Sequence, residues 1–216
     1  MKKAFLLFAA VLTSATLVQG ASVVATNYDE ATGRQLPFST NSGAPFGLGA
    51  GGAGIVAVGT WNASNADVAG LFAQLPSQTV WNQIVSSFLQ FGSTSKVGSD
   101  FPGLYELDAQ RPLFPADVEV GKNIYTLIGN GSTLASSTEA ALVLDPGTFN
   151  FDNPLFAARA EISNPSATVV FGSLNGPSVT SALGAAPSLK FGATVPEPFS
   201  ATLLFAGLAL GFRRRR

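Results

Sequence analysis

The chain has 216 residues, of which only 12% are charged, and it contains neither cysteine nor histidine. These absences exclude disulfide bonds, Ser-His-Asp triads, Cys-His dyads and zinc sites built from histidine. Between Ala21 and Val195 six basic residues face twelve acidic ones, a net charge of −6, which argues against direct binding to nucleic acid or anionic lipid.

Residues 1–20 have the composition of a secretory signal peptide. Two lysines follow the first methionine, an apolar stretch covers 4–18, and small residues precede a cleavage point between Gly20 and Ala21. A cut after Ala25 is the alternative, and an uncleaved membrane anchor is the competing interpretation. The pattern predicts export through the secretion machinery and removal of the leader by signal peptidase.

The exported part begins with two predicted strands and a loop between them. Residues 21–29 have an apolar centre and predict a strand, whereas 33–54 are rich in Gly, Pro, Ser and Asn and predict a long loop. Residues 55–61 combine β-branched and aromatic side chains, which is typical of a strand. Trp61, at the end of that strand, is the best candidate among the aromatic side chains for stacking on a sugar. The commoner role of such a residue is in the core.

Two amphipathic helices are predicted next, over 65–75 and 78–91. Ser64 or Asn65 can cap the first helix and Ser77 the second, because these side chains accept hydrogen bonds from the first turn. Apolar residues recur at helical spacing in both segments. They are Val68, Leu71, Phe72 and Leu75, and then Trp81, Ile84, Val85, Phe88 and Leu89.

The remainder of the chain favours strands. Residues 117–120 alternate valine with charge, and 124–128 and 139–145 are rich in β-branched or apolar residues, with turn signals between them. Short strands are also predicted over 168–171 and 189–191. This order predicts a mainly β fold, either an antiparallel β-sandwich or an open barrel, with a two-helix insertion.

The domain organisation follows from these segments. Residues 21–172 form the predicted exported β-rich domain, with the two helices inside it. Residues 173–194 are small and polar, which predicts a partly flexible spacer. A signal peptide precedes the domain and a single C-terminal transmembrane helix follows the spacer.

Residues 195–216 contain a short polar motif, an apolar stretch and a cationic end. The motif covers 195–198, the stretch 199–212 carries no charge, and 213–216 are all arginine. The stretch is shorter than the roughly 20 residues of an ordinary transmembrane helix, and the arginines place its end in the cytoplasm. A helix packed into the core and a basic tail for nucleic acid are the competing interpretations.

This tail resembles the sorting signal of the PEP-CTERM family of bacterial exported proteins. The resemblance implies recognition by an exosortase, a membrane-embedded protease or transpeptidase, with cleavage at or near the motif. Transfer to the cell surface or the exopolysaccharide matrix would follow. The residues that carry it are Val195, Pro196, Glu197 and Pro198 for sorting, and Arg213, Arg214, Arg215 and Arg216 as the membrane stop.

Oxygen-bearing side chains form one weak metal candidate. Asp145, Asn150 and Asp152 lie close together in the sequence, and oxygen ligands of this kind suit Ca²⁺. Their spacing matches no defined calcium loop, and turn-forming roles are the commoner explanation for such residues. No cofactor is predicted.

Paired carboxylates are the only catalytic candidates. Glu106 with Asp108, or Asp117 with Glu119, could supply the two carboxyl groups of a glycoside hydrolase if a cleft held them about 5–9.5 Å apart. Surface charge explains both pairs equally well.

The sequence thus predicts a non-enzymatic exported protein of the cell envelope or extracellular matrix. It would be anchored transiently in the cytoplasmic membrane and processed by an exosortase. The alternatives are a module that binds extracellular polysaccharide and a carboxylate-based secreted glycoside hydrolase.

Overall fold

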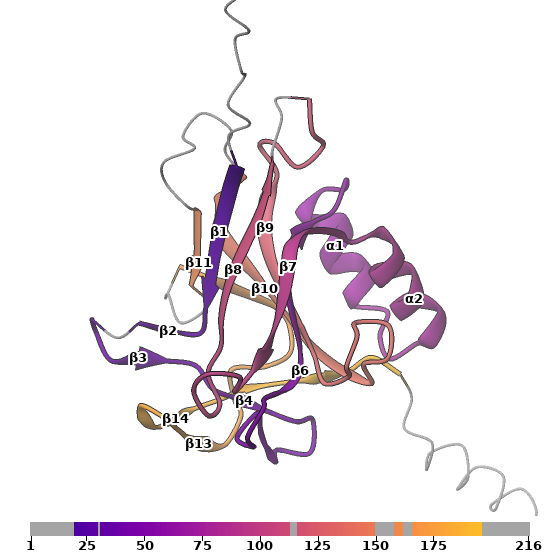
Figure 1. Cartoon of the computed structure of the whole chain (residues 1–216). Coiled ribbons are helices and arrows are strands. Elements are labelled where there is room, and N and C mark those ends of the chain that lie inside the picture. Colours follow the sequence, from indigo (N-terminus) through magenta and orange to yellow (C-terminus); the bar gives the residue numbers. More distant parts are fainter. Residues whose placement is uncertain (1–19, 30, 113–115, 150–157, 162–165, 196–216) are drawn as a thin grey trace, which may run out of the picture.

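The structure is a computed structural model that describes residues 20–29, 31–112, 116–149, 158–161 and 166–195. Within these residues the protein is mainly β, as predicted, with several sheets and two helices. Figure 1 shows the helices lying together against one side of the strands, with the start of the first strand and the β13–β14 hairpin at opposite ends.

In the part of the chain that the structure describes, the larger sheet has six strands, all paired in antiparallel fashion. Its path runs β12–β10–β9–β6–β7, and β16 pairs with β10 beside that path. The strands are β6 (Ala53–Thr60), β7 (Leu89–Val97), β9 (Asn123–Gly129), β10 (Glu139–Thr148), β12 (Thr168–Phe171) and β16 (Gly192–Ala193).

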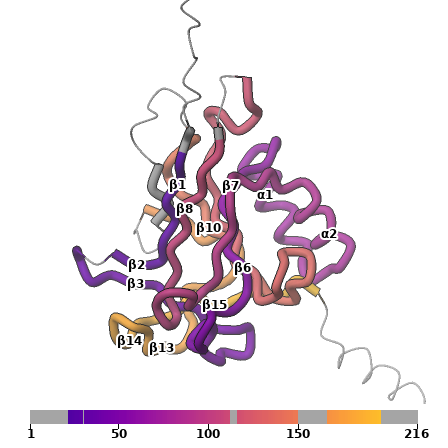
Figure 2. The backbone as a smooth tube through the Cα atoms, viewed as in Figure 1, coloured from indigo at the N-terminus to yellow at the C-terminus, as the bar shows by residue number. Residues whose placement is uncertain are grey.

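The second sheet has three strands among the described residues and lies beside the first. Its order is β11–β1–β8, in which β1 is antiparallel to β8 but parallel to β11. β8 lies next to β7 of the larger sheet, where the Ser93 hydroxyl donates to the Asp108 carbonyl at 3.2 Å. The trace in Figure 2 shows the two sheets meeting along these strands. Their bounds are β1 (Gly20–Thr26), β8 (Glu106–Pro112) and β11 (Ala158–Glu161).

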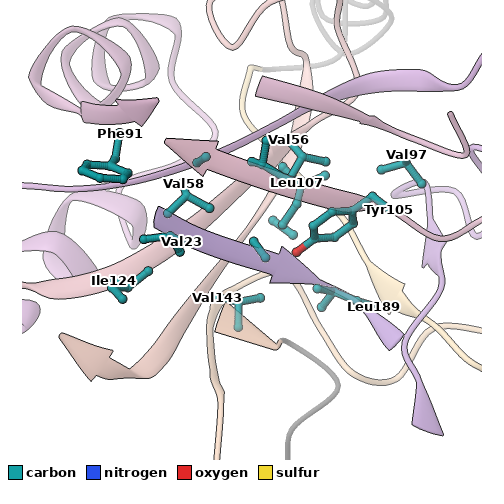
Figure 3. Close-up of a cluster of buried hydrophobic side chains, with 14 of the residues drawn as sticks. Val23, Val56, Val58, Phe91, Val97, Tyr105, Leu107, Ile124, Val143 and Leu189 are labelled. Carbon is teal, nitrogen blue, oxygen red and sulfur yellow. The ribbon is translucent and has the colours of Figure 1, made fainter. Parts of the chain in front are cut away.

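The two sheets share one core because alternate residues of each strand point to the same side. Figure 3 shows Val23 of β1, Val58 of β6 and Ile124 of β9 gathered with Tyr105. All of these side chains are buried. Leu189, far along the chain, enters the same cluster (Figure 3).

The opposite face of the larger sheet is also buried, and the helices cover it. Ala57, Tyr125 and Leu142 occupy the alternate positions of β6, β9 and β10 and pack with Phe72 and Trp81 from the helices. The three central strands are therefore apolar on both faces, which explains their nearly continuous apolar sequences.

Both helices begin where their caps predict. The Ser64 hydroxyl accepts from the Asp67 amide at 3.2 Å, and the Asp67 carboxylate accepts from the Ser64 amide at 3.3 Å, a reciprocal capping box. The Ser77 hydroxyl accepts from the Val80 amide at 3.4 Å. The helices are α1 (Asn65–Phe72) and α2 (Gln78–Ser87).

The second helix ends earlier than the predicted 78–91. Phe88 is already extended, with φ −71° and ψ 119°, and the residues from Leu89 onward pair with β6 as strand β7. Pairing with the edge of β6 satisfies the backbone of this segment and buries Phe91 in the core. The strand predicted over 117–120 is also wrong. These residues form turns, and Val118 is 51% exposed.

The predicted loop 33–54 is largely irregular but is fixed by short strands. Phe38 is fully buried, and its ring centroid lies 5.6 Å from that of Phe191. The short strands are β2 (Tyr28–Asp29), β3 (Arg34–Gln35), β4 (Phe38–Ser39) and β5 (Pro45–Phe46), of which β2 precedes the loop.

The prediction that 173–194 is a partly flexible spacer is wrong, because this segment belongs to the folded domain. Leu189 and Phe191 are buried in the shared core, and β15 pairs in parallel with β4. Thr194 is fully buried. The strands of the segment are β13 (Ser178–Ser181), β14 (Gly184–Pro187), β15 (Leu189–Lys190) and β16.

Most of the predicted targeting segments lie outside the described residues. These are residues 1–19 of the signal peptide, residues 196–198 of the sorting motif and the apolar stretch 199–212 with its arginines. Among the helices that the structure describes, neither is long and apolar enough to cross a membrane.

Candidate functional site

The chain is held in the fold up to the residue before the sorting motif. The Thr194 amide donates to the Thr138 carbonyl at 2.9 Å, and its hydroxyl donates to the Ser137 carbonyl at 2.8 Å. The Thr194 carbonyl accepts from the amide of Ser77, the cap of α2, at 3.0 Å. Val195 is the last described residue, so the motif 195–198 follows the folded body directly.

The predicted signal-peptide cleavage point lies at the start of β1. Gly20 and Ala21 are opposite Pro112 and Arg111 of β8. A cut between Gly20 and Ala21 would leave β1 almost whole. A cut after Ala25 would instead remove most of the strand, including the buried Val23.

The hypothesis that Trp61 stacks on a sugar is wrong, because its side chain is buried. Its side chain is 3% exposed and packs against the rings of Phe72, Phe88 and Tyr125. The indole N–H donates to the Ile84 carbonyl at 3.2 Å. Trp61 therefore joins the sheet to the helices and has no free ring face to offer a ligand.

The weak calcium candidate is not assembled by the described residues. Asp145 is buried and accepts from the Gly147 amide at 2.7 Å, as in an ordinary Asx turn. Asn150 and Asp152 lie outside the described residues. The part of the chain that the structure describes contains no cluster of three or more acidic side chains that could hold a metal ion.

The first carboxylate pair lies on the outer face of β8. Glu106 accepts from the Tyr28 hydroxyl at 2.9 Å, and Asp108 accepts from Ser22 at 3.2 Å and from Gln110 at 2.6 Å. Both residues are exposed. Their bonds are those of surface side chains that bridge neighbouring segments.

The second carboxylate pair binds one arginine. Arg111 contacts Glu119 at 2.8 Å and Asp117 at 3.3 Å, and its guanidinium carbon lies 5.3 Å from the ring centre of Phe91. Glu119 is buried. These contacts close the end of the core, which accounts for both acidic residues structurally.

An open groove lies where β12, β15 and β16 meet. Its volume is about 390 Å³, within the range of roughly 300–1,000 Å³ that small-molecule sites occupy. Two hydrogen bonds between Ser173 and Lys190, of 2.9 and 2.8 Å, join the two sides of the groove. The residues that line the groove include Asn41, Phe171, Ser173, Asn175, Lys190 and Gly192.

The Phe171 ring occupies the space that a side chain at residue 192 would fill, and this residue is a glycine. A Cβ atom at Gly192 would lie 2.5 Å from Cζ of Phe171, closer than any tolerated contact. Phe171 also packs against Phe72 of α1, and the centroids of the two rings are 5.3 Å apart. The half-buried Phe171 ring is thus held at the groove.

Three polar side chains of the groove carry unused hydrogen-bonding capacity. Within the described residues, the Lys190 ammonium and the side-chain amides of Asn41 and Asn175 have no hydrogen-bond or ion-pair partner. The Glu139 carboxylate beside the groove is already bound to the Asn41 backbone amide at 2.9 Å.

Sequence reasoning missed this groove because its residues come from three distant segments. The available signal was Phe171, Lys190 and Phe191 standing among small polar residues, in a region predicted as a short strand and a spacer. Comparisons with protein-family models, with curated proteins and with solved structures found no match to this chain.

Proposed function

We propose that this chain is a non-enzymatic bacterial protein of the cell envelope or extracellular matrix, exported through a signal peptide and sorted by an exosortase. The tail carries the proposal. Residues 195–198 give Val-Pro-Glu-Pro, an uncharged stretch follows, and four arginines end it. The exported body would be a β-sandwich or partly open barrel.

The position of the motif relative to the fold supports processing at that point. Because Thr194 is buried and bonded on three sides, cleavage near Pro196 or Pro198 would release or transfer the body without cutting into its core. The same geometry leaves little chain between body and membrane, so the proteolytic step would occur close to the folded surface.

The two carboxylate pairs do not favour a hydrolase. Glu106 and Asp108 bridge exposed strands, and Asp117 and Glu119 share Arg111. The polysaccharide-binding alternative has an observation in its favour, the groove at Lys190.

Mass spectrometry of the mature protein from its native host tests the sorting proposal. We expect a chain that begins at Ala21 and lacks the residues after the Pro-Glu-Pro region. Replacing Glu197 by glutamine together with Pro196 and Pro198 by alanine should leave the precursor in the membrane fraction. The control is Glu106→Gln, which changes the same charge on the exposed face of β8 and should be processed normally. Recovery of secreted wild-type protein that still ends at Arg216 would refute the proposal.

A further inference from the structure

We propose that the groove between β12 and β15–β16 binds an uncharged polysaccharide. The inference concerns the folded body and does not depend on how the tail is processed. It follows from four observations, namely the unused donors of the groove, its aromatic ring, its open shape and the charge of the surrounding domain.

The unused donors indicate a ligand rich in hydroxyl groups. The Lys190 ammonium offers up to three donors, and the amides of Asn41 and Asn175 offer both donors and acceptors. None of these groups has a partner within the described residues. Hydroxyl groups on a sugar ring both donate and accept, so one ring can satisfy amide and ammonium groups together.

The Phe171 ring supplies the apolar part of such a site. The ring is half-buried and lines the groove, with its outer end against Gly192 and the ring of Phe72 beside it. The part of an aromatic ring that lines a polar groove can pack against the apolar C–H groups of a pyranose ring, which an ordinary hydrogen-bonding surface cannot do.

The open shape of the groove and the negative charge of the exported body limit the class of ligand further. The groove is open to solvent, which suits a segment of a polymer better than a small molecule, since small-molecule sites enclose most of their ligand. The exported body carries six basic and twelve acidic residues, and its negative field disfavours a polyanion. An uncharged glycan avoids that repulsion.

Affinity electrophoresis tests the proposal with the full-length chain kept in mild detergent. Native gels would contain dextran, glucomannan or alginate, the last as a polyanionic probe. We expect retardation by at least one of the two uncharged polymers and none by alginate. The variant Asn41→Ala/Asn175→Ala and the variant Lys190→Gln should each weaken that retardation about tenfold or more, as expected for loss of hydrogen bonds to amide and charged donors.

Matched controls separate the groove from general surface effects. Lys96→Gln removes the same charge from β7, outside the groove, and Asn62→Ala removes an exposed amide before α1. Both should bind like the wild type. All variants should keep the wild-type circular dichroism and Tm, because the substituted groove side chains make no bonds within the described residues. Retardation by neither uncharged polymer, equal retardation of groove and control variants, or preference for alginate would overturn the proposal.

Discussion

Tyr105 buries a hydroxyl group in the core without satisfying it. The residue is 2% exposed, and its hydroxyl lies near that of Thr126, but within the described residues neither hydroxyl makes a hydrogen bond of ordinary geometry. Burial raises the pKa of Tyr105 well above that of a free tyrosine. A buried polar group without a partner costs free energy, so this position is a weak point of the core.

Replacing Tyr105 by phenylalanine should leave the free energy of unfolding at pH 7 unchanged or raise it by up to about 1 kcal/mol, because the unpaired hydroxyl is removed. The control is Tyr28→Phe, which breaks the 2.9 Å bond to Glu106 and should cost about 0.5–1.5 kcal/mol. Urea denaturation of both variants measures the difference. A larger loss in Tyr105→Phe than in Tyr28→Phe would contradict the assignment.

The same tyrosine predicts a loss of stability in alkali. An unfolded tyrosine loses its proton near pH 10, whereas burial raises the pKa of Tyr105 in the folded state. Above about pH 10 the unfolded chain therefore binds fewer protons than the folded one, and the free energy of unfolding falls as pH rises. Tyr105→Phe should flatten this fall. Burial also raises the pKa of Tyr125, so a smaller dependence should remain.

Two glycines with positive φ allow the free-energy cost of a steric clash to be measured apart from the cost of backbone strain. At Gly98, with φ +79°, an added Cβ would lie 1.9 Å from the Gly47 carbonyl oxygen, whereas at Gly121, with φ +75°, it would meet nothing within 4 Å. Gly121→Ala should cost roughly 1–2 kcal/mol from strain alone. Gly98→Ala should cost clearly more and broaden or abolish the unfolding transition. Equal melting temperatures for the two variants would show that the 98 loop can move aside.

The segment 189–194 illustrates how a short element gains its order from distant partners. The amides of Leu189, Phe191 and Thr194 donate to carbonyl groups of Pro37, Ser39 and Thr138, at 2.8, 2.9 and 2.9 Å. Hydrogen exchange measured by mass spectrometry should therefore show protection of this segment comparable to that of β10. Exchange at the rate of an unstructured peptide would restore the spacer interpretation.

Elements with a dense apolar sequence or a clear capping residue were predictable, whereas elements with a weaker or ambiguous pattern were not. β6, β9 and the start of β10 carry dense apolar sequence, and Ser64 and Ser77 cap their helices as expected. β8 was not predicted although Leu107 and Ala109 alternate with polar residues. The end of α2 was misplaced because Phe88 and Leu89 fit a helical stripe as well as the strand that pairing with β6 selects.

The described residues form two buried clusters that share three strands. The inner cluster lies between the two sheets, and the outer cluster lies under the helices. Both tryptophans of the chain, Trp61 and Trp81, belong to the outer cluster. Their fluorescence therefore reports the helical layer, whereas far-ultraviolet circular dichroism reports the strands.

Unfolding by urea should give coincident transitions with these two probes, because β6, β9 and β10 cannot lose one cluster and keep the other intact. Leu127→Ala in the outer cluster and Ile128→Ala in the inner cluster should each cost about 2–5 kcal/mol and shift both probes together. Fluorescence that changes at lower urea than circular dichroism would show instead that the helical layer unfolds separately.

The sequence alone determined the mainly β composition, the helix starts and the absence of histidine and cysteine chemistry, because each depends on local pattern or on composition. The targeting signals that we propose rest on the sequence as well. Only the tertiary structure decided that Trp61 is buried, that 173–194 belongs to the domain and that Asn41, Phe171 and Lys190 share a groove. These outcomes depend on pairing between segments far apart in the chain. Isolated apolar residues such as Leu189 carry no local signal of the partner that buries them.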